Sequence, residues 1–184
     1  MALVYTPENP ELGSPCPDFS LPIVTGGKLA KIDLKNFKAL AVMFICNHCP
    51  YVKAVEDRLI TLGRDMKAKG VEFVAIMSND ATIKPDDSPE KLRERAIEKN
   101  YPFPYLFDDT QEVAKRFGAV CTPDFFVYDS NFKLAYRGRL DDSWKDASQV
   151  KAEELRTALE DLVRGETPST KQIPSMGCSI KWKT

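Results

Sequence analysis

The chain has 184 residues and a formal net charge of −1, with 43% hydrophobic and 29% charged residues. This length fits one domain that buries its own core without support from disulfides. Nucleic acids and anionic membranes attract strongly basic surfaces, so the balanced charge argues against both as partners. We therefore expect a globular protein that binds no nucleic acid and no membrane.

The first forty residues predict a lead-in and a hairpin. Residues 1–17 are rich in proline and read as extended chain without helix. Residues 18–24 predict a strand, which turns at 25–27 and returns over 28–32. A short helical turn is expected at 33–37.

The next segment predicts a strand, a helix and a second strand. Residues 40–45 are consecutively apolar, which is typical of a buried strand. The apolar residues from Val52 to Met66 recur at spacings of three and four, which predicts a helix to about residue 68, ended by Gly70. Residues 71–77 form another apolar run. The tight joints of this βαβ unit predict that the two strands are parallel.

The second half alternates short helices and strands before a final helix. After a polar loop at 78–88, we expect helices at 89–99 and 111–117. A strand begins at or after Pro123 and pairs with 133–138. The last helix spans the apolar positions from 152 to 162 and ends at Gly165, and residues 166–184 lack periodicity. The sequence thus predicts a domain over residues 1–165 and a C-terminal tail over 166–184.

Two cysteines stand where the buried strand ends and the long helix begins, in the motif Cys46-Asn47-His48-Cys49-Pro50. A helix N-terminus has unpaired backbone N–H groups and favours negative charge, so a thiol held there loses its proton more easily. His48 is the only histidine of the chain. As a cation or as an N–H donor, it would further stabilise a thiolate on Cys46. We predict that Cys46 is a reactive thiol of lowered pKa.

The cellular compartment bears on what the pair does. The first residues show no basic region and no long apolar run, so we expect a cytoplasmic protein. Structural disulfides are rare in the cytosol, and a close pair there is catalytic or binds metal. Zinc usually needs four protein ligands, whereas the other cysteines are isolated and the histidine lies inside the motif. Redox chemistry without a cofactor is the favoured interpretation.

The remaining cysteines have open roles. Cys121 is either close to the pair or simply a small buried side chain. Cys16 lies between two prolines and is interpreted as structural. Cys178 falls in a tail expected to be mobile, where it is either an inert exposed thiol or a thiol that resolves a sulfenic acid on Cys46.

Three pairs of adjacent acidic residues, at 86–87, 108–109 and 141–142, raise the question of a metal site. No calcium-loop spacing surrounds them. We expect all three pairs to be solvated turns.

The motifs resemble those of a known family. A CxxC at a strand-to-helix joint is similar to that of thioredoxin. Residues 13–21 resemble the opening of the peroxiredoxin and AhpC/TSA group, and Thr122-Pro123 stands where the thioredoxin fold has its cis-proline loop. Residues 174–182 resemble the tail of a bacterial peroxiredoxin-like family. The resemblance covers about residues 12–182 and implies an α/β thioredoxin-like fold, with a central mixed β-sheet flanked by helices, an N-terminal β-hairpin and a helical insertion around 89–99.

The same resemblance implies the reaction and its residues. Cys46 would attack a disulfide and Cys49 would resolve the mixed disulfide. Pro123 would lie against the pair, and the backbone of Thr122 would hydrogen-bond the substrate. The substrate would be a protein or a low-molecular-weight thiol or disulfide, with a reductant that the sequence does not identify. A docking groove of apolar side chains is also expected, made of Phe44, Tyr51, Tyr101 and Phe103.

The chain departs from two patterns of its relatives. Counting back from Cys46, the threonine and proline places of a peroxiredoxin hold Met43 and Ala39, and the buried acid of thioredoxins is replaced by Leu40. Another group would have to act in place of that acid. The Asn47-His48 dipeptide suggests a less reducing pair than that of thioredoxin.

Three functions therefore stay open. The first is a thiol–disulfide oxidoreductase. The alternative is a peroxiredoxin-like antioxidant peroxidase that uses Cys46 with Cys49 or Cys178. A non-catalytic module that binds zinc or a partner is the third.

Overall fold

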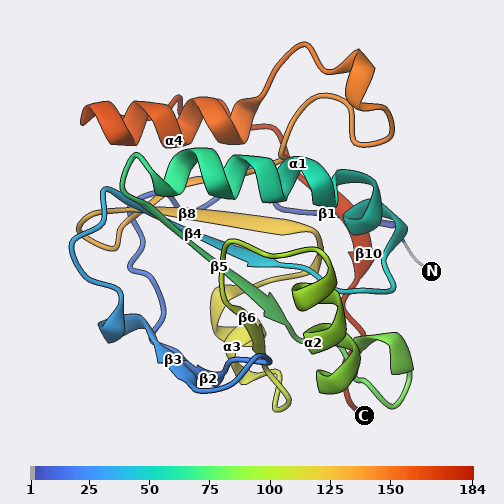
Figure 1. Cartoon of the computed structure of the whole chain (residues 1–184). Helices are drawn as coiled ribbons and strands as arrows, with labels where there is room; N and C mark the ends of the chain where they lie inside the picture. Colours follow the sequence, from blue (N-terminus) through green and yellow to red (C-terminus); the bar gives the residue numbers. More distant parts are fainter. Residues whose placement is uncertain (1–2) are drawn as a thin grey trace.

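A five-stranded mixed sheet forms the centre of the computed structural model, which describes residues 3–184 (Figure 1). Its strand order is β6-β5-β4-β8-β9. Strands β4, β5 and β6 are parallel, as predicted for the βαβ unit, whereas β8 and β9 are antiparallel to their neighbours. The bounds are β4 (Ala39–Phe44), β5 (Val71–Met77), β6 (Tyr105–Phe107), β8 (Asp124–Asp129) and β9 (Leu134–Gly138).

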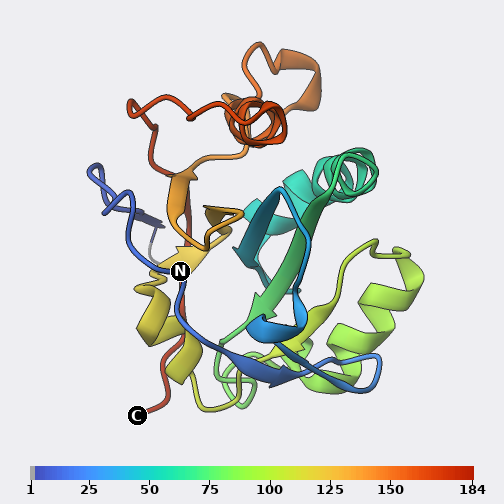
Figure 2. The same ribbon diagram turned by 90° about the vertical axis from the view of Figure 1, so that its left-hand side faces the viewer.

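Helices cover both faces of this sheet, because its central strands are apolar on both sides. Side chains of β4 alternate between two hydrophobic cores, with Met43 in one and Phe44 in the other. The first core is closed by α1 (Pro50–Lys67), α2 (Pro89–Glu98) and α4 (Glu154–Arg164). The second is closed by α3 (Glu112–Phe117) and the hairpin of β2 (Ser20–Pro22) and β3 (Lys28–Ala30) (Figure 2). The predicted N-terminal hairpin and the helix around 89–99 are confirmed.

Local sequence explains where the helices begin and end. Pro50 opens α1, where a missing N–H costs nothing. Ser88 caps α2 by accepting a hydrogen bond from the Lys91 N–H. Gly165 ends α4 with a φ of 79° in the left-handed region that glycine adopts freely.

A second sheet joins the two ends of the chain beside the central one. Its strands are β1 (Leu3–Tyr5), β10 (Met176–Ser179) and β7 (Cys121–Thr122), in the order β1-β10-β7 and all antiparallel. The prediction of a structureless tail is therefore wrong for residues 176–179. The four residues carry no local signal of a strand. Their partner strands, β1 and β7, come from distant parts of the chain.

Smaller differences from the sequence expectations concern short elements. The helical turn expected at 33–37 is instead a 3-10 turn at Lys31–Asp33 (η1), where the Asp33 carboxylate accepts a hydrogen bond from the Ala30 N–H at 3.0 Å. The loop at 78–88 contains a second such turn, η2 (Pro85–Asp87), and a third, η3 (Ala147–Gln149), precedes α4. No helix within residues 3–184 has both the length and the apolar character needed to cross a membrane.

Candidate active site

The two cysteines of the motif lie in the connection from β4 to α1. Cys49 is the N-cap residue of α1, directly before Pro50, and Cys46 follows the end of β4 by two residues. Both are buried, with exposed fractions of 1% for Cys46 and 0% for Cys49. All five cysteines of the chain are present as thiols. The buried strand and the helix thus place two thiols at a helix N-terminus, as the sequence predicted.

The Thr122-Pro123 loop lies against this pair. The peptide bond between the two residues is cis. The Thr122 hydroxyl is 3.3 Å from Cys46 Sγ, and the Cys49 thiol donates to the Thr122 carbonyl at 3.1 Å. The segment expected to bind the substrate backbone is however already paired, because β7 is hydrogen-bonded to β10.

Cys178 is a third thiol of the site. It lies in β10, is 1% exposed, and its Sγ is 3.0 Å from Cys49 Sγ. The expectation of an exposed thiol in a mobile tail is wrong, because β10 carries the residue into the core. Cys121 is buried with its Sγ 3.6 Å from the Pro123 carbonyl, and Cys16 belongs to the core on the opposite face of the sheet.

His48 and a buried carboxylate complete the site. Nδ1 of His48 is 3.5 Å from Cys46 Sγ and 2.6 Å from Asp87 Oδ2. Asp87 is fully buried and also accepts hydrogen bonds from the backbone N–H groups of Asn47 and His48 and from the Asn79 amide, at 2.8, 3.1 and 2.9 Å. Asp87 therefore fixes the motif loop and orients the imidazole.

Sequence reasoning missed Asp87 because adjacent acids in a turn are usually solvated. The neighbouring Asp86 is exposed, as expected, while the 3-10 turn η2 rotates Asp87 inward. One member of each of the other two pairs is also buried: Asp108 accepts from Ala114 N–H and Asp141 pairs with Arg58. The sequence offers no signal that separates the two members of such a pair.

The hydrogen bonds of His48 select one tautomer. Because a carboxylate only accepts, the hydrogen on Nδ1 points toward Asp87 and Cys46. Nε2 is buried and has no hydrogen-bond partner among the described residues. The Nδ1 hydrogen is held by Asp87 at 2.6 Å, with Cys46 Sγ farther away at 3.5 Å, so stabilisation of a Cys46 thiolate by His48 stays a prediction.

Charge in the thiol cluster concentrates on Cys49. Hydrogen bonding from Cys46, reinforced by Cys178, Thr122 and the Val52 N–H and opposed by burial, lowers the pKa of Cys49 from 9.0 to about 5. Burial, the neighbouring Cys49 and the charge of Asp87 raise the pKa of Cys46. Burial and the hydrogen bond to Cys49 raise the pKa of Cys178 to about 12. The lowered pKa therefore belongs to Cys49 at the helix N-cap and not, as the sequence predicted, to Cys46.

Three of these side chains also form a group that could hold a metal ion. The ligand atoms of Cys46, His48 and Asp87 all lie within 4.8 Å of one another. Tetrahedral zinc with bonds of about 2.0 to 2.1 Å separates its nitrogen and oxygen ligands by roughly 3.3 Å. The 2.6 Å between Nδ1 and Oδ2 is a hydrogen bond, and these atoms would have to move apart around an ion.

The predicted docking groove is mostly core. Phe44 and Phe103 are buried in the two cores, and the Tyr101 hydroxyl donates to Glu56 at 2.7 Å. Tyr51 lines a surface cavity, where its ring centroid lies 4.5 Å from that of Trp144. This cavity of about 160 Å³ is lined by Tyr51, Trp144 and Pro123, among others. It is the apolar surface beside the cis-proline loop.

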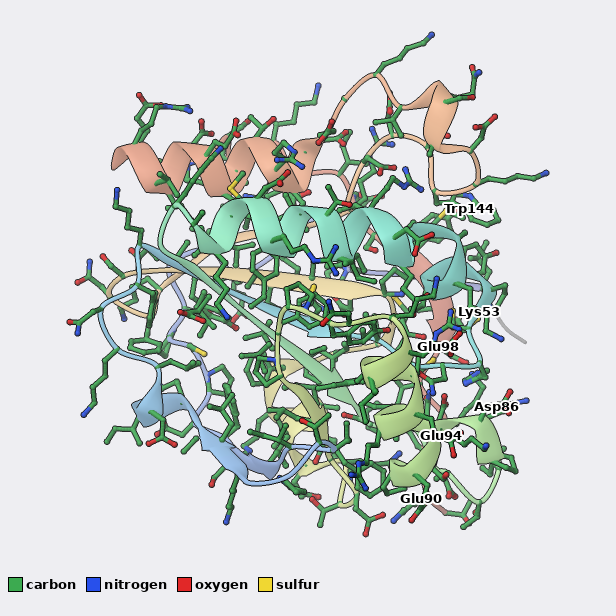
Figure 3. The ribbon with its side chains drawn as sticks, viewed as in Figure 1. Lys53, Asp86, Glu90, Glu94, Glu98 and Trp144 are labelled. Atoms are coloured by element: carbon green, nitrogen blue, oxygen red, sulfur yellow. The ribbon has the colours of Figure 1, made fainter. Side chains whose placement is uncertain are left out.

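Figure 3 shows side chains around the N-terminal end of α1 and along α2, the two helices next to the motif. Trp144 lies beyond the N-terminal end of α1, and Glu90, Glu94 and Glu98 follow one side of α2. Asn47 of the motif ties α2 to the site, since its side-chain amide donates to the carbonyls of Asp86 and Lys91 at 3.0 Å each. The motif is thus bordered by an apolar cavity on one side and, on the other, by α2, whose glutamates alternate with Lys91 and Arg95.

Comparison with known proteins places this geometry in a family. The model of the AhpC/TSA family matches residues 12–137. The chain belongs to the AhpC/TSA family. The sequence resemblance is confirmed, and the match includes the motif, Asp87 and the cis-proline loop. It ends before β10, so the third thiol lies outside the matched part of this AhpC/TSA protein.

Solved structures and curated relatives agree with the assignment. An uncharacterized conserved protein from Geobacillus kaustophilus is 49% identical, with a TM-score of 0.94 over 100% of this chain and 97% of that one. A putative thioredoxin from Neisseria meningitidis is 20% identical, with a TM-score of 0.63 over 81% and 89%, which shows the thioredoxin-like fold. A protein named thiol-disulfide oxidoreductase ResA, from Bacillus thuringiensis subsp. konkukian, is 24% identical over 88% of this chain and 82% of its own length.

Proposed function

We propose that this protein is a thiol–disulfide oxidoreductase in which Cys46 and Cys49 exchange disulfides with a protein or low-molecular-weight substrate. The class of activity follows the family and the relative named ResA. The assignment to this pair rests chiefly on two buried thiols at a helix N-terminus beside a cis-proline loop. No cofactor takes part in the proposed reaction.

The single negative charge of the pair drives both steps. The Cys49 thiolate takes the proton of Cys46, and the Cys46 thiolate attacks a substrate sulfur to form a mixed disulfide. The released substrate thiolate takes the proton that Cys49 now carries. Cys49 then attacks Cys46 Sγ, which releases the second substrate thiolate and leaves the Cys46–Cys49 disulfide. The N–H of His48, oriented by Asp87, stabilises the transient thiolate on Cys46.

The substrate would enter beside Pro123. The cavity lined by Tyr51 and Trp144 offers apolar surface for a peptide or a small disulfide. Because Cys46 is only 1% exposed, the motif loop has to open for attack. The proposal includes a cytoplasmic location, where a reducing environment returns the pair to dithiol.

The test is turnover of a peptide disulfide with excess dithiothreitol. Cys46→Ser and Cys49→Ser should each lose activity, while Cys16→Ala, in the core on the other face, should retain it. Retained activity in either serine variant would contradict the assignment. So would a stoichiometric zinc ion that protects Cys46 from alkylation, because the pair would then be the zinc-binding alternative.

A second candidate, an antioxidant thiol peroxidase, is favoured by one contact. Peroxiredoxins use a threonine hydroxyl beside the reactive thiol, and here the Thr122 hydroxyl lies 3.3 Å from Cys46 Sγ although residue 43 is methionine. Consumption of hydrogen peroxide with dithiothreitol separates the two activities. A peroxidase would lose activity in Thr122→Val and would oxidise Cys46 to a sulfenic acid that dimedone traps.

A further inference from the structure

The C-terminal strand is held against the active site from both sides. In β10, Cys178 stands opposite Thr122 of β7 and opposite Leu3 of β1. The nearby Ser175 donates its hydroxyl to the Pro123 carbonyl at 2.9 Å. Its backbone N–H donates to the Thr6 hydroxyl, and its carbonyl accepts from the Thr6 N–H, each at 2.9 Å. The strand therefore touches the same loop that holds the thiols of the motif.

The residue before Cys178 allows this close approach. A Cβ added to Gly177 would lie 1.9 Å from the Thr122 carbonyl oxygen and 2.5 Å from its carbon. Backbone atoms cannot yield to such a contact, so any side chain at 177 would push β10 away from the loop. Gly177 thus sets the distance between Cys178 and the motif.

The two sulfurs are close enough to bond after a small movement. Cys178 Sγ and Cys49 Sγ are 3.0 Å apart, and a disulfide bond is about 2.05 Å long. Both thiols are buried in the described structure. Cys49 and Cys46 both contact Thr122, through its carbonyl at 3.1 Å and its hydroxyl at 3.3 Å, so Cys49 has a cysteine on either side.

We propose that Cys178 is a third redox residue, which takes over Cys49 from the Cys46–Cys49 disulfide to form a Cys49–Cys178 disulfide. The inference rests on the proposed function, which supplies the first disulfide. The Cys178 thiolate attacks Cys49 Sγ, the bond between Cys46 and Cys49 breaks, and Cys46 leaves as a thiolate. The proton lost by Cys178 ends on Cys46. One disulfide is exchanged for another, so no external oxidant or reductant is needed.

After this exchange, the disulfide no longer includes Cys46, the thiol that attacks the substrate. Cys46 returns as a thiol beside His48 and Thr122, while the disulfide is carried by the strand and the helix N-cap. It also joins the C-terminal strand covalently to the motif. The oxidised protein therefore exists in two forms, which differ in the state of Cys46.

Disulfide mapping of the full chain tests the proposal. The protein is oxidised in glutathione buffer, quenched with acid, alkylated with N-ethylmaleimide and digested with trypsin without reduction. Cleavage after lysine gives one peptide, 39–53, that holds both motif cysteines, and another, 172–181, that holds Cys178. An internal disulfide in 39–53 reports the first form, and a link between the two peptides reports the second.

We expect the linked peptides in at least about one tenth of the oxidised molecules, and in a larger share of oxidised Cys46→Ser protein, where Cys49 has lost its partner in the motif. Cys121→Ser is the matched control, since Cys121 is equally buried near the loop and should change neither product. Internal disulfide in the wild type without any link in Cys46→Ser would overturn this inference and leave the proposed function standing. The absence of both products in the wild type would overturn the proposed function as well.

Discussion

Two segments meet at Cys49, and they are held in different ways. The motif segment, residues 46–50, is held by the end of β4 and the first turn of α1, which adjoin it in the sequence, and by hydrogen bonds to the Asp87 side chain. The C-terminal strand is held by backbone pairing with β1 and β7 and by the absence of a side chain at Gly177. Cys49 therefore has two neighbouring cysteines as candidate disulfide partners, one three residues away and one 129 residues away.

Loss of Cys49 should have the largest effect, because it removes the residue that both segments share. Cys49→Ser is expected to lower turnover of a peptide disulfide at least about a thousandfold. Cys178→Ser leaves the motif pair intact and should lower it by less than about tenfold. Steady-state assays with dithiothreitol give the ratio. Equal losses in the two variants would mean that the strand and the motif are not separable.

Gly177→Ala changes the C-terminal strand β10 and leaves the motif segment as it is. The added Cβ meets the Thr122 carbonyl, and overpacking of this kind costs about 1 to 3 kcal/mol. Urea unfolding should show this loss of stability, and the link between peptides 39–53 and 172–181 should disappear. Ser179→Ala, on the same strand, is the control and should leave both unchanged. A fully stable Gly177→Ala protein would contradict the pairing of β10 with β7.

The charge on Cys49 should make the stability of the reduced protein depend on pH. Folding lowers the pKa of Cys49 from 9.0 to about 5, so its contribution is present above the unfolded value and is lost as the pH falls through the folded value. Urea unfolding of reduced wild type and Cys49→Ser, at about pH 8.5 and about pH 5, measures it. The advantage of the wild type should shrink at the lower pH. A difference in unfolding free energy that does not change with pH would show that Cys49 does not have the lowered pKa.

Asp87→Asn tests the other segment. The negative charge of Asp87 raises the pKa of Cys46, so its removal should lower that pKa. In the Cys49→Ser background, the rate of alkylation of Cys46 by iodoacetamide should then rise at lower pH than with Asp87 present. Asp86→Asn is a matched control, because the adjacent carboxylate is exposed. An identical profile in both variants would remove Asp87 from the electrostatics of the site.

Trp144→Ala should give the smallest effect, since it changes the proposed entrance and neither segment. Loss of its contact surface is expected to raise KM for a peptide disulfide about fivefold, which corresponds to roughly 1 kcal/mol, with kcat unchanged. Trp182→Ala is the control, because Trp182 is similarly exposed (39% against 36%) and does not line the cavity. A rise in KM for Trp182→Ala, with none for Trp144→Ala, would contradict the proposed entrance and indicate that the substrate binds near the C-terminal end.

Much of the fold could be predicted because its signals are local. The apolar run of β4 and the three-and-four spacing of α1 are properties of contiguous residues, and the motif lies at their junction. The role of β10 could not be predicted in this way. Met176–Ser179 has neither alternation nor a long apolar run, and its partners begin at residues 3 and 121.

The site shows the same division. Cys46, Cys49, Thr122 and Pro123 are brought together as the motifs indicated. Asp87 was missed because its burial depends on the turn η2 folding back onto the motif, and the sequence of an acidic pair does not reveal which member turns inward. The sequence predicted the lowered pKa for Cys46, whereas hydrogen bonding from Cys46 and, to a smaller extent, from Cys178 lowers the pKa of Cys49, and these contacts depend on the fold.

The most direct test of the account is a redox titration of the full protein in glutathione buffers, read by the masses of alkylated peptides. The account predicts a reversible disulfide that involves Cys49 in every oxidised molecule, with a potential between about −270 and about −120 mV, the range of working exchange catalysts. Cys49 that stays reduced throughout the titration, while the protein remains folded, would contradict it.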